Sequence, residues 1–321
     1  MKRPTPGTLL RLIFAAALVG YTLWTSDPRA VWRICKRASL APLMVAVALV
    51  VVDRALMAYR WFVLLRPLEG RNLPSFGTIL RIFFVSTFVG TFLPASIGGD
   101  AVRAYSLSSH RVPIADSIAS VFLDRMLGVL SVLVMALVGL FLARDLAADR
   151  AIILALGITT LACIVAAALI FSTTADALAE TLLARVRWVW LRTAAGSLIA
   201  SIRRYAGHHR ALGNVLISSI TVQILRVFQA YSLGVALGIQ QPLVTYFAFI
   251  PLILLITFLP ITANGIGTSQ AAFVWLFGRA GTSGAEAFAL SVLFVGLGIL
   301  ANMIGAPLCL NRSPQPSSAG G

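Results

Sequence analysis

Several apolar runs of this chain are long enough to cross a lipid bilayer, and this length constrains the fold more than any other feature. A transmembrane helix needs roughly 20 apolar residues, and one of the runs has 18 uncharged residues from Met126 to Ala143. Only 12% of the residues are charged, about half the share found in soluble domains. An outer-membrane barrel would instead show alternating segments of about ten residues. The sequence therefore predicts an all-α polytopic integral membrane protein.

The predicted helices form a single transmembrane domain, residues 1–310, followed by a disordered tail at 311–321 that is rich in Pro, Ser and Gly. The first apolar run, Leu9 to Trp24, is expected to be an uncleaved helix, because no small-residue cleavage site follows it. The other apolar helices are expected at about 40–66, 74–94, 114–143, 151–171, 212–238, 242–260, 266–280 and 286–310.

A basic stretch from Glu180 to Arg210 mixes six arginines with Leu, Val and Trp. This mixture favours a helix that lies in the membrane interface against anionic headgroups. A solvated linker of helical propensity is the alternative.

Two predicted elements look like copies of one another. The segments 74–94 and 242–260 both lie between prolines and both end in Thr-Phe-Leu-Pro. Each is preceded by a helix with polar residues and followed by a Gly-containing break, a short helix and a long apolar helix. We therefore predict two repeats, at about 40–143 and 212–310, with 151–171 as a linker helix between them.

The repeats are expected to be inverted if each broken element is a re-entrant pair that enters and leaves on one side. Each repeat then crosses the bilayer twice, and the linker helix and the first apolar helix add one crossing each, which gives about six full crossings and two re-entrant pairs in total. With both termini in the cytoplasm, the cytoplasmic segments hold 17 of the 26 Lys and Arg and the external segments hold seven. This bias agrees with the positive-inside rule, although the run Arg29 to Arg37 lies on the wrong side.

The two breaks are the expected functional region. Non-helical backbone inside a membrane is tolerated only where protein or a watery cavity surrounds it, and matched broken helices point to a transport site near the midplane. Pro94 and Pro260 each remove a backbone donor and end a helix. The alternative is that these residues only kink packed helices. The glycines expected to form tight turns are Gly98, Gly99, Gly265 and Gly267.

Charged residues follow the first break. Asp100 and Arg103 are spaced i, i+3 and share one helical face. Asp124 and Arg125 lie in the long helix that follows, and adjacent helical residues point apart, so they need different partners. We expect Asp124 to pair with an arginine of another element, and Arg125 to pair with Asp100 or Asp53. Each of these charges could serve a structural ion pair or a substrate contact.

The second repeat carries neutral polar groups and one arginine. Gln223, Arg226 and Gln229 form one polar stripe on helix 212–238, which is expected to face the interior. Arg226 is the candidate for an anionic headgroup, because its planar guanidinium suits phosphate. Asn264 and Gln270 add polar groups at the second break.

Other site classes find little support in the sequence. The net charge of +15 is explained by arginines that flank helices, and no aromatic-basic motif indicates nucleic-acid binding. The three cysteines lack metal-ligand or disulfide spacing. We expect no metal and no cofactor.

At these same residues the sequence resembles the transmembrane region of lysylphosphatidylglycerol synthetases, a flippase-like family. The resemblance rests on "FLPASIGGDAVRAYSL", "ADSIASVFLDRMLGVLSVL" and "FLPITANGIGTSQAAF", and it spans about residues 10 to 310. Gln270 stands where the family usually has an acid, and the soluble aminoacyl-transfer domain of the bifunctional members is not seen. The resemblance implies movement of a lipid or lipid-linked molecule between leaflets rather than synthesis of a lysyl-lipid.

The sequence thus predicts a lipid flippase-like transporter, not an enzyme, in a bacterial inner membrane, with membrane lipids as its partners. Two alternatives are a membrane-embedded enzyme acting on a lipid-linked substrate and a non-transporting partner of an envelope-lipid enzyme. A homodimer is also compatible with the sequence.

Overall fold

Helices make up all the regular structure of the ranges that the computed structural model describes, which are 6–68, 73–93, 97–142, 150–171, 188–258, 262 and 265–310. Four of these helices are longer than 20 residues, α3 (Leu40–Leu65), α6 (Ile114–Leu142), α7 (Arg150–Phe171) and α10 (His209–Leu237), and α13 (Gly284–Asn302) has 19. The others are α1 (Pro6–Thr25), α2 (Pro28–Lys36), α4 (Phe76–Phe92), α5 (Ile97–Ser108), α9 (Val189–Arg204), α11 (Leu243–Phe258), α12 (Thr268–Arg279), α14 (Gly305–Leu310) and the 3-10 turns η1 (Arg66–Leu68) and η3 (Tyr205–Gly207).

Most of these helices begin and end within a few residues of the predicted bounds. Two differences stand out. Helix α2 was not predicted, because its nine residues are too few to show a membrane-length run, although the side chain of Asp27 caps its N-terminus. The predicted helix 286–310 ends at Asn302 and resumes as α14. The tail 311–321 and the first residues of the basic stretch, 180–187, lie outside the described residues.

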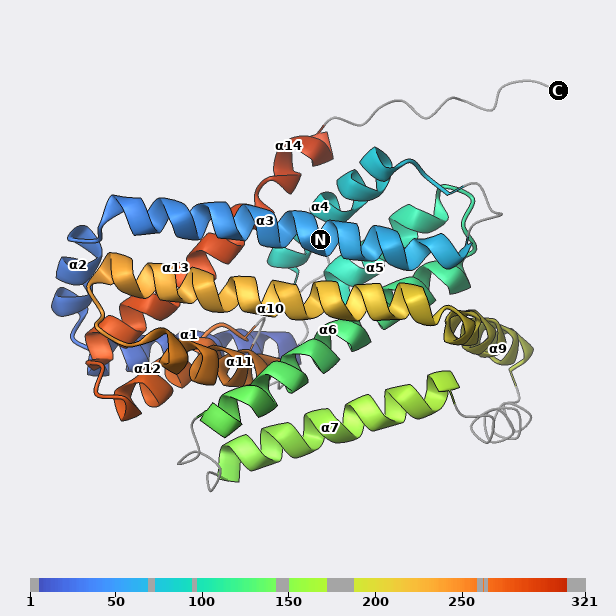
Figure 1. The fold of residues 1–321 in the computed structure, drawn as a ribbon. Helices are drawn as coiled ribbons and strands as arrows, with labels where there is room; N and C mark the ends of the chain where they lie inside the picture. Colours follow the sequence, from blue (N-terminus) through green and yellow to red (C-terminus); the bar gives the residue numbers. More distant parts are fainter. Residues whose placement is uncertain are drawn as a thin grey trace.

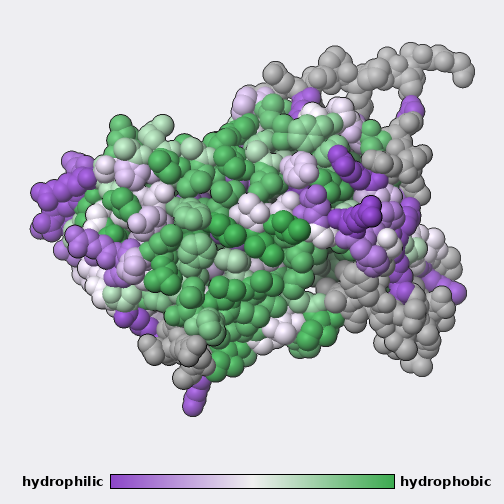
Figure 2. Space-filling view, in the orientation of Figure 1, coloured by the Kyte–Doolittle hydropathy of each residue, from purple (hydrophilic) through white to green (hydrophobic). Residues whose placement is uncertain are grey.

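The chain is an all-helical, polytopic membrane protein. Four of the described helical segments are long and apolar enough to cross a bilayer: Leu40–Leu68, Ile114–Leu142, His209–Leu237 and Gly284–Cys309. Figure 2 shows a broad hydrophobic band between two hydrophilic ends, and α3, α6 and α10 run between these ends in Figure 1. The remaining crossings of the expected six stay a prediction.

Helices α3 and α10 lie side by side along their lengths and run in opposite directions (Figure 1). Two hydrophobic clusters occupy the interior. One contains Trp61 and Phe83 near the end where α3 finishes, and the other contains Tyr246, Phe273 and Phe277 near the end where α10 finishes.

The border between the two clusters falls at charged residues. Along α3, Ala46 belongs to one cluster and Ala58 to the other, and Asp53 lies between them. Along α10, Val215 and Val227 belong to different clusters, with Gln223 and Arg226 between them. The middle of the bundle is therefore a polar layer between two apolar halves.

The broken elements form two antiparallel pairs, α4 with α5 and α11 with α12. The first pair packs with its backbones nearly in contact: a Cβ atom on Gly99 would lie 2.8 Å from the carbonyl oxygen of Ser86 and 3.1 Å from the Cα of Gly90. Gly98 and Gly99 lie inside α5, so the prediction that they form a tight turn is wrong. The two glycines instead allow α5 to pack closely against α4 and the residue that follows it.

The second break does use glycine for its backbone freedom. Gly265 and Gly267 have φ values of 73° and 87°, a region that side chains with a Cβ rarely adopt. These two residues turn the chain into α12, as predicted. Pro94, Pro260 and Asn264 lie outside the described residues.

Replacing Gly99 by Ala is expected to destabilise the protein by about 1–3 kcal/mol, the usual cost of overpacking, because the new methyl group would meet backbone atoms of α4. Gly77→Ala is the matched control on α4, where a Cβ meets nothing within 4 Å. Unfolding titrations in mixed detergent micelles measure both variants. Equal stability of the two variants would contradict the close packing.

Candidate functional site

A cavity of about 330 Å³ lies where the two breaks approach one another. Its lining includes Gly99 and Asp100 from the first break and Ile266 from the second. Helix α4 contributes Ser86, Thr87, Gly90 and Thr91, and α13 contributes Val295, Gly298, Ile299 and Asn302. The cavity is therefore enclosed by elements of both predicted repeats. Its volume is at the lower end of the range of about 300–1,000 Å³ for ligand pockets.

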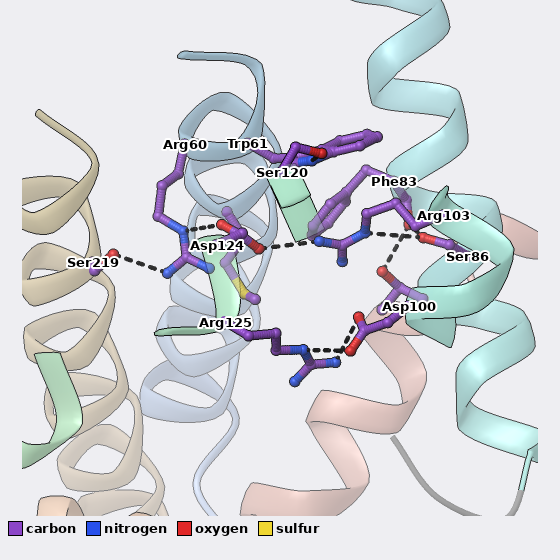
Figure 3. Close-up of polar contacts among 12 residues, drawn as sticks. Arg60, Trp61, Phe83, Ser86, Asp100, Arg103, Ser120, Asp124, Arg125 and Ser219 are labelled. Atoms are coloured by element: carbon purple, nitrogen blue, oxygen red, sulfur yellow. Dashed lines mark hydrogen bonds and ion pairs between the residues drawn. The ribbon is translucent and has the colours of Figure 1, made fainter. Parts of the chain in front are cut away.

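Asp124 is the central charge at this cavity. One carboxylate oxygen accepts a 2.8 Å hydrogen bond from Nε of Arg60, and the other accepts a 3.0 Å bond from Arg103 (Figure 3). All three side chains are buried, with 6% exposure or less. Because α6 starts at Ile114 and a helix rises 1.5 Å per residue, Asp124 lies about 15 Å along α6.

The two arginines that hold Asp124 are themselves fixed by other contacts. Arg60 donates to the hydroxyl of Ser219 on α10. Arg103 lies over the rings of Trp61 and Phe83, with its guanidinium carbon 5.2 and 4.8 Å from the ring centroids. Aromatic faces attract guanidinium groups, so Arg103 is held on two sides. This cluster ties α3, α5, α6 and α10 together.

Arg125 turns the other way from Asp124 and binds Asp100 with two parallel hydrogen bonds of 2.8 and 3.0 Å (Figure 3). This confirms both pairings predicted for the adjacent residues of α6. The Arg125 side chain is 43% exposed and that of Asp100 is 19% exposed. The pair is thus more accessible than the Asp124 cluster.

A second ion cluster lies midway along α3 and α10. Asp53 accepts hydrogen bonds of 3.1 Å from Arg226 and 3.1 Å from its neighbour Arg54. Arg54 also donates to the carbonyl of Gly298 on α13, over 3.3 Å. Arg54 lines the cavity, whereas Arg226 and Asp53 are not among its lining residues.

The predicted polar stripe of α10 faces the interior, since Gln223 and Gln229 are buried and Arg226 reaches Asp53. Gln223 donates to Ser131 on α6, so it joins two helices. Gln270 is buried and accepts hydrogen bonds from the Gly267 N–H and the Ser269 hydroxyl, and it thereby caps α12. These residues lie outside the cavity lining, whereas Asp100, Arg103, Asp124 and Arg125 line it together.

Sequence reasoning missed two cavity arginines, Arg54 and Arg60. It counted them, with Arg103, among the basic residues of cytoplasmic segments. The structure instead places all three inside α3 and α5, facing the cavity. Without these three arginines, the predicted cytoplasmic segments hold 14 Lys and Arg and the external segments hold seven. The charge bias that supports the predicted orientation is therefore weaker. The missed signal was that the apolar pattern of 40–66 continues on both sides of these charges, which marks them as intramembrane residues.

Asp124→Asn is expected to destabilise the protein by about 3–5 kcal/mol, because it leaves the buried charges of Arg60 and Arg103 without a counter-charge. Asp100→Asn is the matched control. It breaks a partly exposed pair, and the expected cost is at most about 1 kcal/mol. Unfolding titrations measure both variants, and a loss of stability as small for Asp124→Asn as for Asp100→Asn would contradict the assigned role.

Comparison with known proteins places this arrangement in a family. The family model for the lysylphosphatidylglycerol synthase TM region matches residues 8–305. Searches of curated proteins and of solved structures found no significant match. The matched range covers nearly the whole chain and every residue of the cavity lining, so this protein belongs to the lysylphosphatidylglycerol synthase transmembrane-region family.

Proposed function

We propose that this protein moves a lipid or lipid-linked molecule between the leaflets of the inner membrane. The observation that carries the proposal is the charged cavity at the level where the two breaks meet. A headgroup needs polar partners and space to pass the hydrocarbon, while acyl chains can stay in lipid. The cavity offers arginines, carboxylates and hydroxyls for the headgroup, and its volume is too small to enclose a whole lipid.

The proposal includes an inverted repeat of the two halves. Support comes from the opposite directions of α3 and α10 and from the matched order of elements in each half. In Figure 1, α4 and α5 lie at the end where α3 finishes, and α11 and α12 lie toward the end where α10 finishes. Rocking of one half against the other would then expose the cavity to each side in turn.

The exchange proposal predicts that proteoliposomes containing the protein accelerate dithionite quenching of a fluorescent inner-leaflet lipid. Arg125→Gln is expected to slow this exchange about tenfold, because it removes the most accessible cation of the cavity. Arg150→Gln, an exposed arginine at the start of α7, is the matched control and should exchange like the wild type.

Exchange that is equally fast in Arg125→Gln and the wild type would refute the role of the cavity. A covalent change in the labelled lipid would instead favour the enzyme alternative. An absence of exchange together with a stoichiometric co-purified protein would favour the role of a partner protein.

The inverted repeat makes a separate prediction about topology. Single cysteines are introduced at Ser109, between α5 and α6, and at Gln240, between α10 and α11, after Cys35, Cys163 and Cys309 are changed to Ser. A membrane-impermeant maleimide should label Gln240→Cys in intact cells and Ser109→Cys only after permeabilisation. Labelling of both from the same side would rule out the inverted arrangement.

A further inference from the structure

The charges of the cavity do not balance. The network combines five arginines with three aspartates among the residues that the structure describes: Arg54, Arg60, Arg103, Arg125 and Arg226 against Asp53, Asp100 and Asp124. Five positive and three negative charges leave an excess of two positive charges. The lining residues alone give the same excess, since four of the arginines and two of the aspartates line the cavity.

This excess cannot be removed by deprotonation. An arginine side chain is not deprotonated in proteins. The other carboxylates that the structure describes are engaged elsewhere: Asp116 pairs with Arg204, Asp27 caps α2 and Glu286 caps α13. An unpaired charge inside a membrane protein is costly. An anionic ligand would relieve this cost.

Two of the five arginines are held more tightly than the others. Arg60 and Arg103 are both tied to Asp124, and each has a further partner on another helix. Arg226 is bound to Asp53 and is not part of the cavity lining. Arg54 and Arg125 are therefore the two arginines of the cavity lining that are not bound to Asp124.

Arg54 is the less satisfied of these two. It shares the single carboxylate of Asp53 with Arg226, and its Nε atom is buried without a hydrogen-bond partner. Arg125, by contrast, already holds Asp100 with two bonds. Arg54 lines the cavity, and the charge and planar shape of a guanidinium group suit the oxygens of a phosphate.

We propose that the cavity binds a phosphate group that carries two negative charges, as in a phosphomonoester headgroup, and that Arg54 is its main contact. Two negative charges match the excess of two positive charges, whereas a phosphodiester carries one. The phosphate could belong to a lipid or be free in solution. The lipid assignment rests on the proposed leaflet exchange, whereas the preference for two charges does not.

The test measures binding to the full-length protein in dodecylmaltoside micelles by native mass spectrometry. The probes are dioctanoyl phosphatidic acid, which is a phosphomonoester, and dioctanoyl phosphatidylglycerol, which is a diester with the same chains. We expect phosphatidic acid to bind at least tenfold more tightly than phosphatidylglycerol at pH 7.5. Equal affinities would overturn the proposal.

Arg54→Gln is expected to lower the affinity for phosphatidic acid at least tenfold, whereas Arg54→Lys, which keeps the charge but not the planar donor group, should lower it less. Arg150→Gln is the control for loss of one surface charge and should bind like the wild type. Unchanged binding by Arg54→Gln would overturn the role of Arg54.

A pH titration of the wild type tests the same idea without any variant. A phosphomonoester loses its second proton near pH 6, so lowering the pH from 7.5 to 5.5 should weaken the binding of phosphatidic acid. The diester does not titrate in this range. It therefore controls for titration of Asp53, Asp100 and Asp124, the carboxylates of the network among four helices. An equal change for both probes, or no change for either, would contradict the preference for two charges.

Inorganic phosphate separates the two sources of the ligand. If it competes with phosphatidic acid only at concentrations at least a hundredfold higher, the acyl chains contribute to binding and the ligand is a lipid. Competition at equal concentration would support the phosphate site while refuting lipid exchange. Fast exchange of lipids without any preference for phosphatidic acid would support lipid exchange while refuting the phosphate site.

Discussion

The ion bridge from Arg60 through Asp124 to Arg103 is the interaction on which the rest of the site depends. A single carboxylate serves two guanidinium groups from α3 and α5 while it sits on α6. In an apolar interior a charge without its partner costs several kcal/mol, so the three helices must keep their mutual register. Ser86 on α4 also accepts a hydrogen bond from Arg103, so the position of α5 against α4 helps to orient that side chain. The close approach at Gly90 and Gly99 sets this position.

The same bridge explains why the polar layer divides the interior. Charged side chains cannot be mixed into an aromatic cluster without unpaired donors and acceptors. The apolar residues therefore collect on either side, around Trp61 in one half and Phe277 in the other. Each half is packed apolar material, and the connection between the halves runs through hydrogen bonds and ion pairs. Such contacts can exchange partners, with water or with a headgroup, at lower cost than a packed core can be pulled apart.

The sequence predicted most of the helices and the pairing of two adjacent residues, an arginine of another element for Asp124 and Asp100 or Asp53 for Arg125. These predictions succeeded because they depend on apolar run length and on the 100° turn between neighbouring helical residues, which are local properties. The roles of Gly98 and Gly99 were predicted wrongly, because a glycine that turns the chain and a glycine that admits a neighbouring helix look the same in sequence. Arg54 and Arg60 were missed for a related reason. Both were counted with the cytoplasmic charges, although the apolar pattern of 40–66 continues on both sides of them, and their partners on α6, α10 and α13 become known only from the fold.

The difference between the two breaks has a consequence for charge. Gln270 accepts the N–H of Gly267, and a glutamate at that position could accept the same bond, so capping alone does not require the neutral amide. The family resemblance leads one to expect an acid there. Gln270 lies outside the cavity lining but only four residues from Ile266, which belongs to it, so an acid at position 270 would add a negative charge close to the cavity. The neutral glutamine adds no negative charge there, so the excess of positive charge that favours a doubly charged ligand remains. Selection of the ligand by its charge then depends on the arginines of α3, α5 and α6.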